Sequence, residues 1–200
     1  MSELKSSSVQ WGVIAAAYAS LFALGLSDNA RGPLFPDILA ELGLGDATGS
    51  WMFGVTSVGM IAGSLGIRPV VTWFSARRVL QGSLLGLALS LVALGCSPSL
   101  VPLLGASLAM GLALGGLVLS QNLLVQEATP PALQRRVFSG LHSMYGVASL
   151  LAPLAVVASR GAGFGWREVL LWLALPSVAV AIGAHFVRPS ASPPPDSAAL

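Results

Sequence analysis

Residues 11–38 read WGVIAAAYASLFALGLSDNARGPLFPDI, an apolar run that ends in charges and prolines. A helix over residues 9–27 would be about 28 Å long, close to the ~30 Å hydrocarbon core of a bilayer. Asp28 and Arg31 would then lie among the outer headgroups and need no special role. If the helix instead continues past Ser27, both charges lie within the membrane. The length of this helix therefore decides whether the chain carries a visible polar site.

The composition predicts an all-α, polytopic membrane protein. Of the 200 residues, 54% are hydrophobic and 9% are charged, whereas a soluble domain has about 25% charged residues. Apolar runs of about 20 residues recur along the chain, and each can cross a bilayer as a helix. The net charge of +2 comes without a basic stripe, so we expect the lipid bilayer and no nucleic acid as a partner. One cysteine, no histidine–carboxylate cluster and no phosphate-binding glycine motif are present, so no metal or other cofactor is expected.

Six membrane spans are predicted within a six-helix domain of residues 9–188. The breaks between them are charged, proline-rich or glycine-rich, as at Arg77-Arg78 and in residues 128–136. Residues 1–8 are expected to form a cytoplasmic tail, and the Pro-rich residues 189–200 a disordered one. The spans cover residues 10–38, 49–72, 79–96, 100–125, 137–158 and 168–187.

The distribution of basic residues predicts the orientation. One side of the membrane receives seven of them: Lys5, Arg68, Arg77, Arg78, Arg135, Arg136 and Arg188. The other side receives Arg31, Arg160 and Arg167. Because Lys and Arg are enriched in cytoplasmic loops, both termini are expected in the cytoplasm, with the protein in the inner (plasma) membrane.

Glycines at four-residue spacing recur in the spans. The pairs are Gly59/Gly63, Gly82/Gly86 and Gly111/Gly115. Such pairs let the backbones of neighbouring helices approach closely, so we predict that all three are packing seams.

Three stretches resemble the N-terminal half of a major facilitator superfamily transporter. They are GLSDNARGPLFPDI at 25–38, GSLGIRPVVTWFSARRVLQG at 63–82 and FSGLHSMYGVASLLAPL at 138–154, the last most similar to the sugar and fucose permease-like branch. The resemblance covers about residues 9–188 and implies secondary transport of a small polar solute. It also favours a first helix that reaches about Leu39, with a bend around Gly32-Pro33 and Pro36.

The chain departs from the family pattern in several places. Counting back from Arg77-Arg78, the loop motif between spans two and three has Ala76, Trp73 and Pro69 where the family has Gly, Asp and Gly. Ser107 stands near the place of a fourth-span arginine, and Ala152 precedes Pro153 where the antiporter motif has glycine. These departures argue against proton-driven drug antiport.

The resemblance also implies that six spans are half of a transporter. Family members have about 12 spans in two halves, so a homodimer or a separately encoded second half would complete the unit. A non-transporting interaction module or a truncated remnant is the alternative. An enzyme is not expected, because the stretch closest to an intramembrane serine protease motif, VFSGLH, has Val137 in place of the first glycine.

Asp28, Asn29 and Arg31 are the main candidates for a substrate or proton site. Asp28 and Arg31 lie three residues apart, so they share a helix face and can pair. The resemblance implies an acidic coupling residue near this place. Aligned on Pro36, that position falls on Gly32, one turn after Asp28.

Other polar candidates lie in spans four and five. Asn122 and Gln126 share one face and could bind solute hydroxyls or simply bond neighbouring helices. His142 and Tyr145 lie three residues apart, and His142 is either a proton relay or a hydrogen-bonded structural residue.

Overall fold

The computed structural model describes residues 9–187. The two predicted tails, 1–8 and 189–200, lie outside the described residues, as do Lys5 and Arg188. The described residues form seven α-helices: α1 (Trp11–Leu42), α2 (Asp46–Gly49), α3 (Trp51–Trp73), α4 (Ala76–Gly95), α5 (Leu100–Ala128), α6 (Pro131–Gly161) and α7 (Trp166–Phe186). They give six segments long and apolar enough to cross a membrane, with α2 and α3 together in one of them (Asp46–Trp73), which confirms the all-α, six-span prediction.

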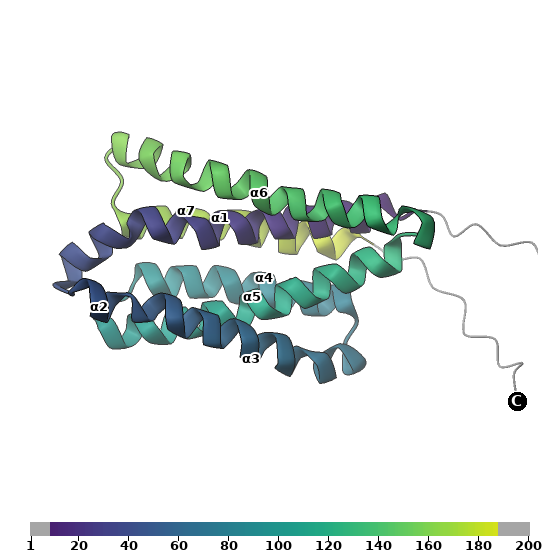
Figure 1. Ribbon diagram of the computed structural model, residues 1–200, viewed down its shortest axis with the longest axis horizontal. Helices are drawn as coiled ribbons and strands as arrows, with labels where there is room; N and C mark the ends of the chain where they lie inside the picture. The colour runs from purple at the N-terminus through teal and green to yellow at the C-terminus, as the bar shows by residue number, and fades with distance from the viewer. Residues whose placement is uncertain (1–8, 188–200) are drawn as a thin grey trace, which may run out of the picture.

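The first helix is continuous from Trp11 to Leu42, so the longer alternative is confirmed and a helix ending at Ser27 is wrong. It ends at Gly43, whose φ of 63° is left-handed and whose N–H donates to the carbonyl of Leu39. Such an end suits glycine, which lacks a Cβ. Pro33 and Pro36 lie inside the helix, and Figure 1 shows α1 bending toward its Leu42 end, as prolines cause.

Helix α6 differs most from its predicted span. It begins at Pro131, not at residue 137. Proline is well suited to the first helical position, because its missing N–H would have no partner there. The proline-rich break was therefore a helix start rather than a loop.

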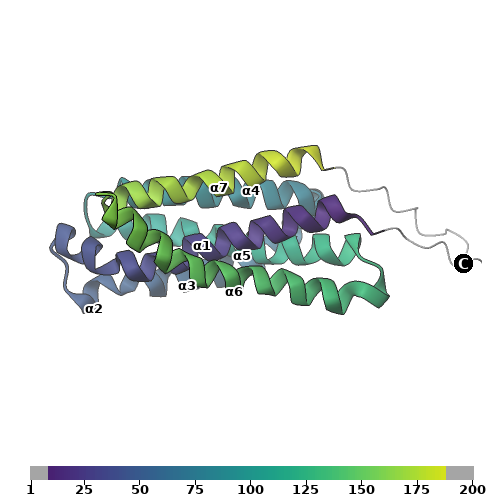
Figure 2. The ribbon, with the colours of Figure 1, turned by 90° about the horizontal axis from the view of Figure 1, so that it is seen from above.

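The helices lie in three layers of two. Figure 2 shows α3 and α6 along one side, α4 and α7 along the opposite side, and α1 and α5 between them. Helix α3 packs mainly on α5, and α6 packs mainly on α1. The two central helices therefore connect the layers.

Two of the three predicted glycine seams are confirmed, and they form a single interface. A Cβ on Gly111 would lie 2.2 Å from the carbonyl oxygen of Thr56, and one on Gly115 would lie 2.3 Å from that of Met60. Gly59 and Gly63 face the same interface from α3, with Cβ positions 2.6 and 2.4 Å from backbone oxygens of α5. Only glycine permits this approach of α3 to α5.

The third predicted seam, Gly82/Gly86, is wrong. A Cβ on Gly82 would meet no atom within 4 Å, and one on Gly86 would make an ordinary contact of 3.5 Å with Ala113. The physical reason is that α3 and α4, although joined by a short turn, barely contact each other and pack separately on α5. These glycines face an open groove instead.

The described chain begins and finishes at the same end of the bundle, which we call the terminal end (Figure 1). The backbone N–H of Gln10 donates to the carbonyl of Ala128 at 3.1 Å. Arg77 donates from Nη1 to the carbonyl of Val187 at 2.6 Å. These bonds tie the beginning of α1 and the residue after α7 to the neighbouring helix turns.

The opposite, distal end is tied by charged side chains. Arg160 pairs with Asp37 and also donates to the carbonyl of Pro33 at 3.0 Å. Arg167 pairs with Glu41 at 2.8 Å and donates to the carbonyl of Gly95 at 2.7 Å. The end of α1 is thereby held against the α4, α6 and α7 ends.

Thiol labelling tests the predicted orientation, because the single cysteine, Cys96, is exposed at a distal turn. If the termini are cytoplasmic, a membrane-impermeant maleimide added to intact cells should label Cys96. A Cys96→Ser/Ala132→Cys variant, whose thiol lies at the start of α6 at the terminal end, should be labelled only after the cells are opened. The reverse pattern would contradict the orientation.

Packing of the seam can be tested by Gly111→Leu. We expect a loss of stability of at least about 1–3 kcal/mol, the usual effect of overpacking a core, because the added side chain meets backbone rather than a movable group. Thermal unfolding of the purified protein in mild detergent measures the loss. Gly105→Leu on the same helix is the control, since its Cβ meets nothing within 4 Å. Equal stability of the two variants would show that the seam is not tightly packed.

Candidate functional site

The second half of α1 carries an ion pair between a buried arginine and a half-buried aspartate. Arg31 is 4% exposed, and one of its terminal nitrogens pairs with Oδ1 of Asp28. Arg31 lies about 30 Å along the helix from Trp11 and about 17 Å from Leu42. The prediction that the two residues share a face and pair is confirmed, whereas the assignment of Arg31 to the outer loops is wrong.

Arg31 also reaches across to α3. Its Nη1 donates to Oγ1 of Thr56 at 2.8 Å, and Thr56 in turn donates to the carbonyl of Met52 at 2.7 Å. The Phe53 ring lies beside the guanidinium, with its centroid 5.4 Å from Cζ, a favourable cation–π distance. Helices α1 and α3 are not closely packed partners, so this long side chain and the contact between the Phe35 and Phe53 rings connect them. The remaining nitrogen, Nε, is buried without a hydrogen-bond partner among the described residues.

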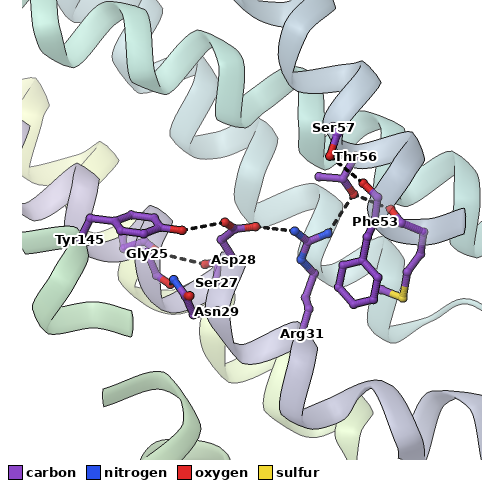
Figure 3. Close-up of polar contacts among 11 residues, drawn as sticks. Gly25, Ser27, Asp28, Asn29, Arg31, Phe53, Thr56, Ser57 and Tyr145 are labelled. Carbon is purple, nitrogen blue, oxygen red and sulfur yellow. Dashed lines mark hydrogen bonds and ion pairs between the residues drawn. The ribbon is translucent and has the colours of Figure 1, made fainter. Parts of the chain in front are cut away.

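Asp28 connects the pair to α6. The hydroxyl of Tyr145 donates to Oδ2 of Asp28 at 3.0 Å. The two helices approach closely here, because a Cβ on Gly25 would lie 2.7 Å from the Cβ of Ala148. Figure 3 shows the resulting row of four side chains, Tyr145, Asp28, Arg31 and Thr56, which we call the polar bridge. It crosses three helices.

The two charged residues of the polar bridge differ in their exposure. The Asp28 side chain is 30% exposed, while that of Arg31 is 5% exposed. Asp28 therefore keeps contact with the surroundings of the bundle, and Arg31 depends on protein partners for its charge and its N–H groups.

The other predicted site residues are not part of the bridge. Asn29 is adjacent to it but donates to the carbonyl of Gly25, within its own helix, at 2.8 Å. His142 and Gln126 are exposed. Asn122 is half-buried, and its Oδ1 has no hydrogen-bond partner among residues 9–187.

Sequence reasoning missed the contribution of α3. Thr56 and Phe53 are single residues in an apolar span, and no spacing connects them with Arg31 before the helices are placed. It also did not predict the hydrogen bond from Ser20 to Gln121, 2.9 Å long, which joins the central helices α1 and α5. Within the part of the chain that the structure describes, no group of three His, Cys, Asp or Glu residues could hold a metal ion.

Comparisons with known proteins agree with this architecture. Residues 17–200 match the family model of the Major Facilitator Superfamily. The chain is 24% identical over 191 residues to the 4-hydroxybenzoate transporter PcaK of Pseudomonas aeruginosa, covering 92% of this chain and 41% of that protein. It is 24% identical over 162 residues to the 4-hydroxybenzoate transporter PcaK of Pseudomonas putida, covering 81% of this chain and 36% of that one.

The chain thus spans less than half the length of the curated relatives that it matches. The family model covers most of the chain, and residues 9–187 contain six helical segments long and apolar enough to cross a membrane. The chain is a multi-pass membrane protein and belongs to the major facilitator superfamily.

Proposed function

We propose that this chain is one half of a secondary transporter for a small organic anion, with the polar bridge as the polar part of its site. The observation that carries the proposal is Arg31, an arginine 4% exposed in the interior of an apolar bundle. A charge at the centre of a membrane helix costs about 2.5–3.5 kcal/mol on insertion scales, and such residues commonly mark substrate or proton paths.

The contacts of Arg31 suit an aromatic carboxylate. Guanidinium groups bind carboxylates through two parallel N–H bonds, and Nε still has a free donor. Phe53 lies beside the guanidinium and packs edge-to-face on Phe35, with ring centroids 5.2 Å apart. A planar aromatic acid would find a cation and aromatic edges together. The names of the two relatives, both 4-hydroxybenzoate transporters, support this substrate class.

Asp28 and a bound carboxylate compete for the same guanidinium. When Asp28 takes up a proton it loses its charge, and Arg31 becomes available to the substrate anion. Proton binding and anion binding then favour each other. This exchange is a physical basis for the coupling role proposed for Asp28.

A complete transport unit needs a second set of six helices. Helices α3 and α6 form the layer that we call the bridge-side layer (Figure 2). Apolar side chains are exposed on both of its helices, such as Ile61 of α3 at 61% and Leu150 of α6 at 73%. In this family, transport moves one half against the other around a central site. We propose that a second copy, related by a two-fold axis along the membrane normal, or a separately encoded half supplies the opposite wall.

A non-transporting membrane module is the second candidate. The observation that favours it is the departure of the loop between spans two and three from the family pattern, with Ala76, Trp73 and Pro69 where the family has Gly, Asp and Gly. Uptake measurements separate the two candidates.

Uptake of labelled 4-hydroxybenzoate into vesicles containing the purified protein tests the site. With an inward proton gradient, we expect uptake by the wild-type protein and at least about a tenfold loss, equivalent to about 1.4 kcal/mol, in both Asp28→Asn and Arg31→Ala. The first variant loses the exchangeable proton, and the second loses the cation.

Two charge-matched controls lie on the distal surface. Asp37 and Arg160 form a pair whose side chains are each 41% exposed, so Asp37→Asn and Arg160→Ala should retain most of the uptake per folded protein. If Asp28→Asn and Arg31→Ala also leave uptake unchanged, the polar bridge is not the site. If the folded wild-type protein moves no solute and is a monomer, the homodimer is excluded. Uptake that co-expression with a second six-helix half restores would then support the split transporter, and its absence the non-transporting module.

A further inference from the structure

A second feature of the structure lies away from the polar bridge and shares no residue with it. It is a groove of about 660 Å³ between α3, α4 and α5, within the range of 300–1,000 Å³ that is typical of ligand clefts. Its walls are apolar except for Arg78, Ser83 and Ser90. It opens on the outer surface of the bundle, where lipid surrounds a membrane protein.

Small residues create this groove. Gly82 and Gly86 lie on its α4 wall, and Ala109 and Ala113 lie on its α5 wall. A Cβ on Gly82 would meet no atom within 4 Å. The space therefore has two causes: these small side chains, and the separation of α3 from α4, which barely contact each other although both pack on α5.

The groove has a charged terminal end and an apolar interior. Arg78 lines it at the start of α4, is exposed, and forms no ion pair among the described residues. The α4 residues that line it run from Arg78 to Ala93, a length of about 22 Å. One leaflet contributes about 15 Å of hydrocarbon, so the groove is long enough for an acyl chain of one leaflet that starts at Arg78.

We propose that this groove binds one anionic phospholipid, with its acyl chain along α4 and its phosphate paired with Arg78. The charges at the terminal end favour an anion. Among the described residues of that end, one is acidic, Glu127, and five are basic: Arg68, Arg77, Arg78, Arg135 and Arg136. Lipid tails are as apolar as the groove walls, so the tail gains little by leaving the bilayer. The shape of the groove selects a tail, and Arg78 selects the headgroup.

Native mass spectrometry of the full-length protein, delipidated in mild detergent and titrated with single lipids, tests the proposal. Phosphatidylglycerol should bind in a 1:1 complex more tightly than phosphatidylcholine with the same chains. Arg78→Gln should weaken phosphatidylglycerol binding about fivefold, the effect of one basic residue at a membrane surface, and leave phosphatidylcholine unchanged. Gly82→Leu should weaken the binding of both lipids, because it fills the groove.

Matched controls lie elsewhere on the chain. Arg135→Gln removes another arginine of the terminal end, outside the groove. Gly183→Leu adds the same side chain on α7, where a Cβ also meets nothing within 4 Å. Both should bind phosphatidylglycerol like the wild type. Equal binding of the two lipids by the wild type, or equal losses in Arg78→Gln and Arg135→Gln, would overturn the proposal and leave only bulk lipid contact.

Discussion

A guanidinium group cannot lie in an apolar membrane bundle without partners, and Arg31 does lie there, 4% exposed. It stays charged at any physiological pH, so the fold must supply an anion and hydrogen-bond acceptors. Asp28 supplies the anion from one turn earlier on the same helix. From α3, Thr56 supplies an acceptor, and the ring of Phe53 lies against the guanidinium. Because Tyr145 bonds the same carboxylate from α6, one buried charge links three helices.

The polar bridge matters because of which helices it joins. The two central helices, α1 and α5, each pack against a helix of the bridge-side layer and a helix of the opposite layer. The set α1, α3, α4 is thus matched by the set α5, α6, α7, which agrees with the 3+3 repeats within each half of this superfamily. The polar bridge joins the two sets across the bridge-side layer. A change in the charge of Asp28 would therefore act on α1, α3 and α6 together.

The sequence allowed much of this structure to be predicted. Hydropathy was sufficient for six spans, and the three-residue spacing of Asp28 and Arg31 was sufficient for their pairing. The glycine seam between α3 and α5 was also predicted, because Gly59/Gly63 and Gly111/Gly115 both have the required spacing. The same rule failed at Gly82 and Gly86, where no backbone of a neighbouring helix comes close. Spacing shows that a helix could be approached closely, but not whether a partner is present. Thr56 and Phe53 could not be predicted for a similar reason, since their role exists only when α3 lies beside α1.

The unfolding free energy of four proteins in detergent tests most directly whether Asp28 and Arg31 form a buried pair: the wild type, Asp28→Asn, Arg31→Gln and the double variant. Asp28→Asn leaves the buried guanidinium without its anion and should lose about 3–5 kcal/mol. Arg31→Gln leaves the half-buried Asp28 unpaired and should lose less. The double variant should then lose much less than the sum of the two. Losses that are each below about 1 kcal/mol and simply add, as for exposed pairs, would contradict the buried bridge. The exposed Asp37–Arg160 pair, with side chains 41% exposed, provides the reference cycle in the same protein.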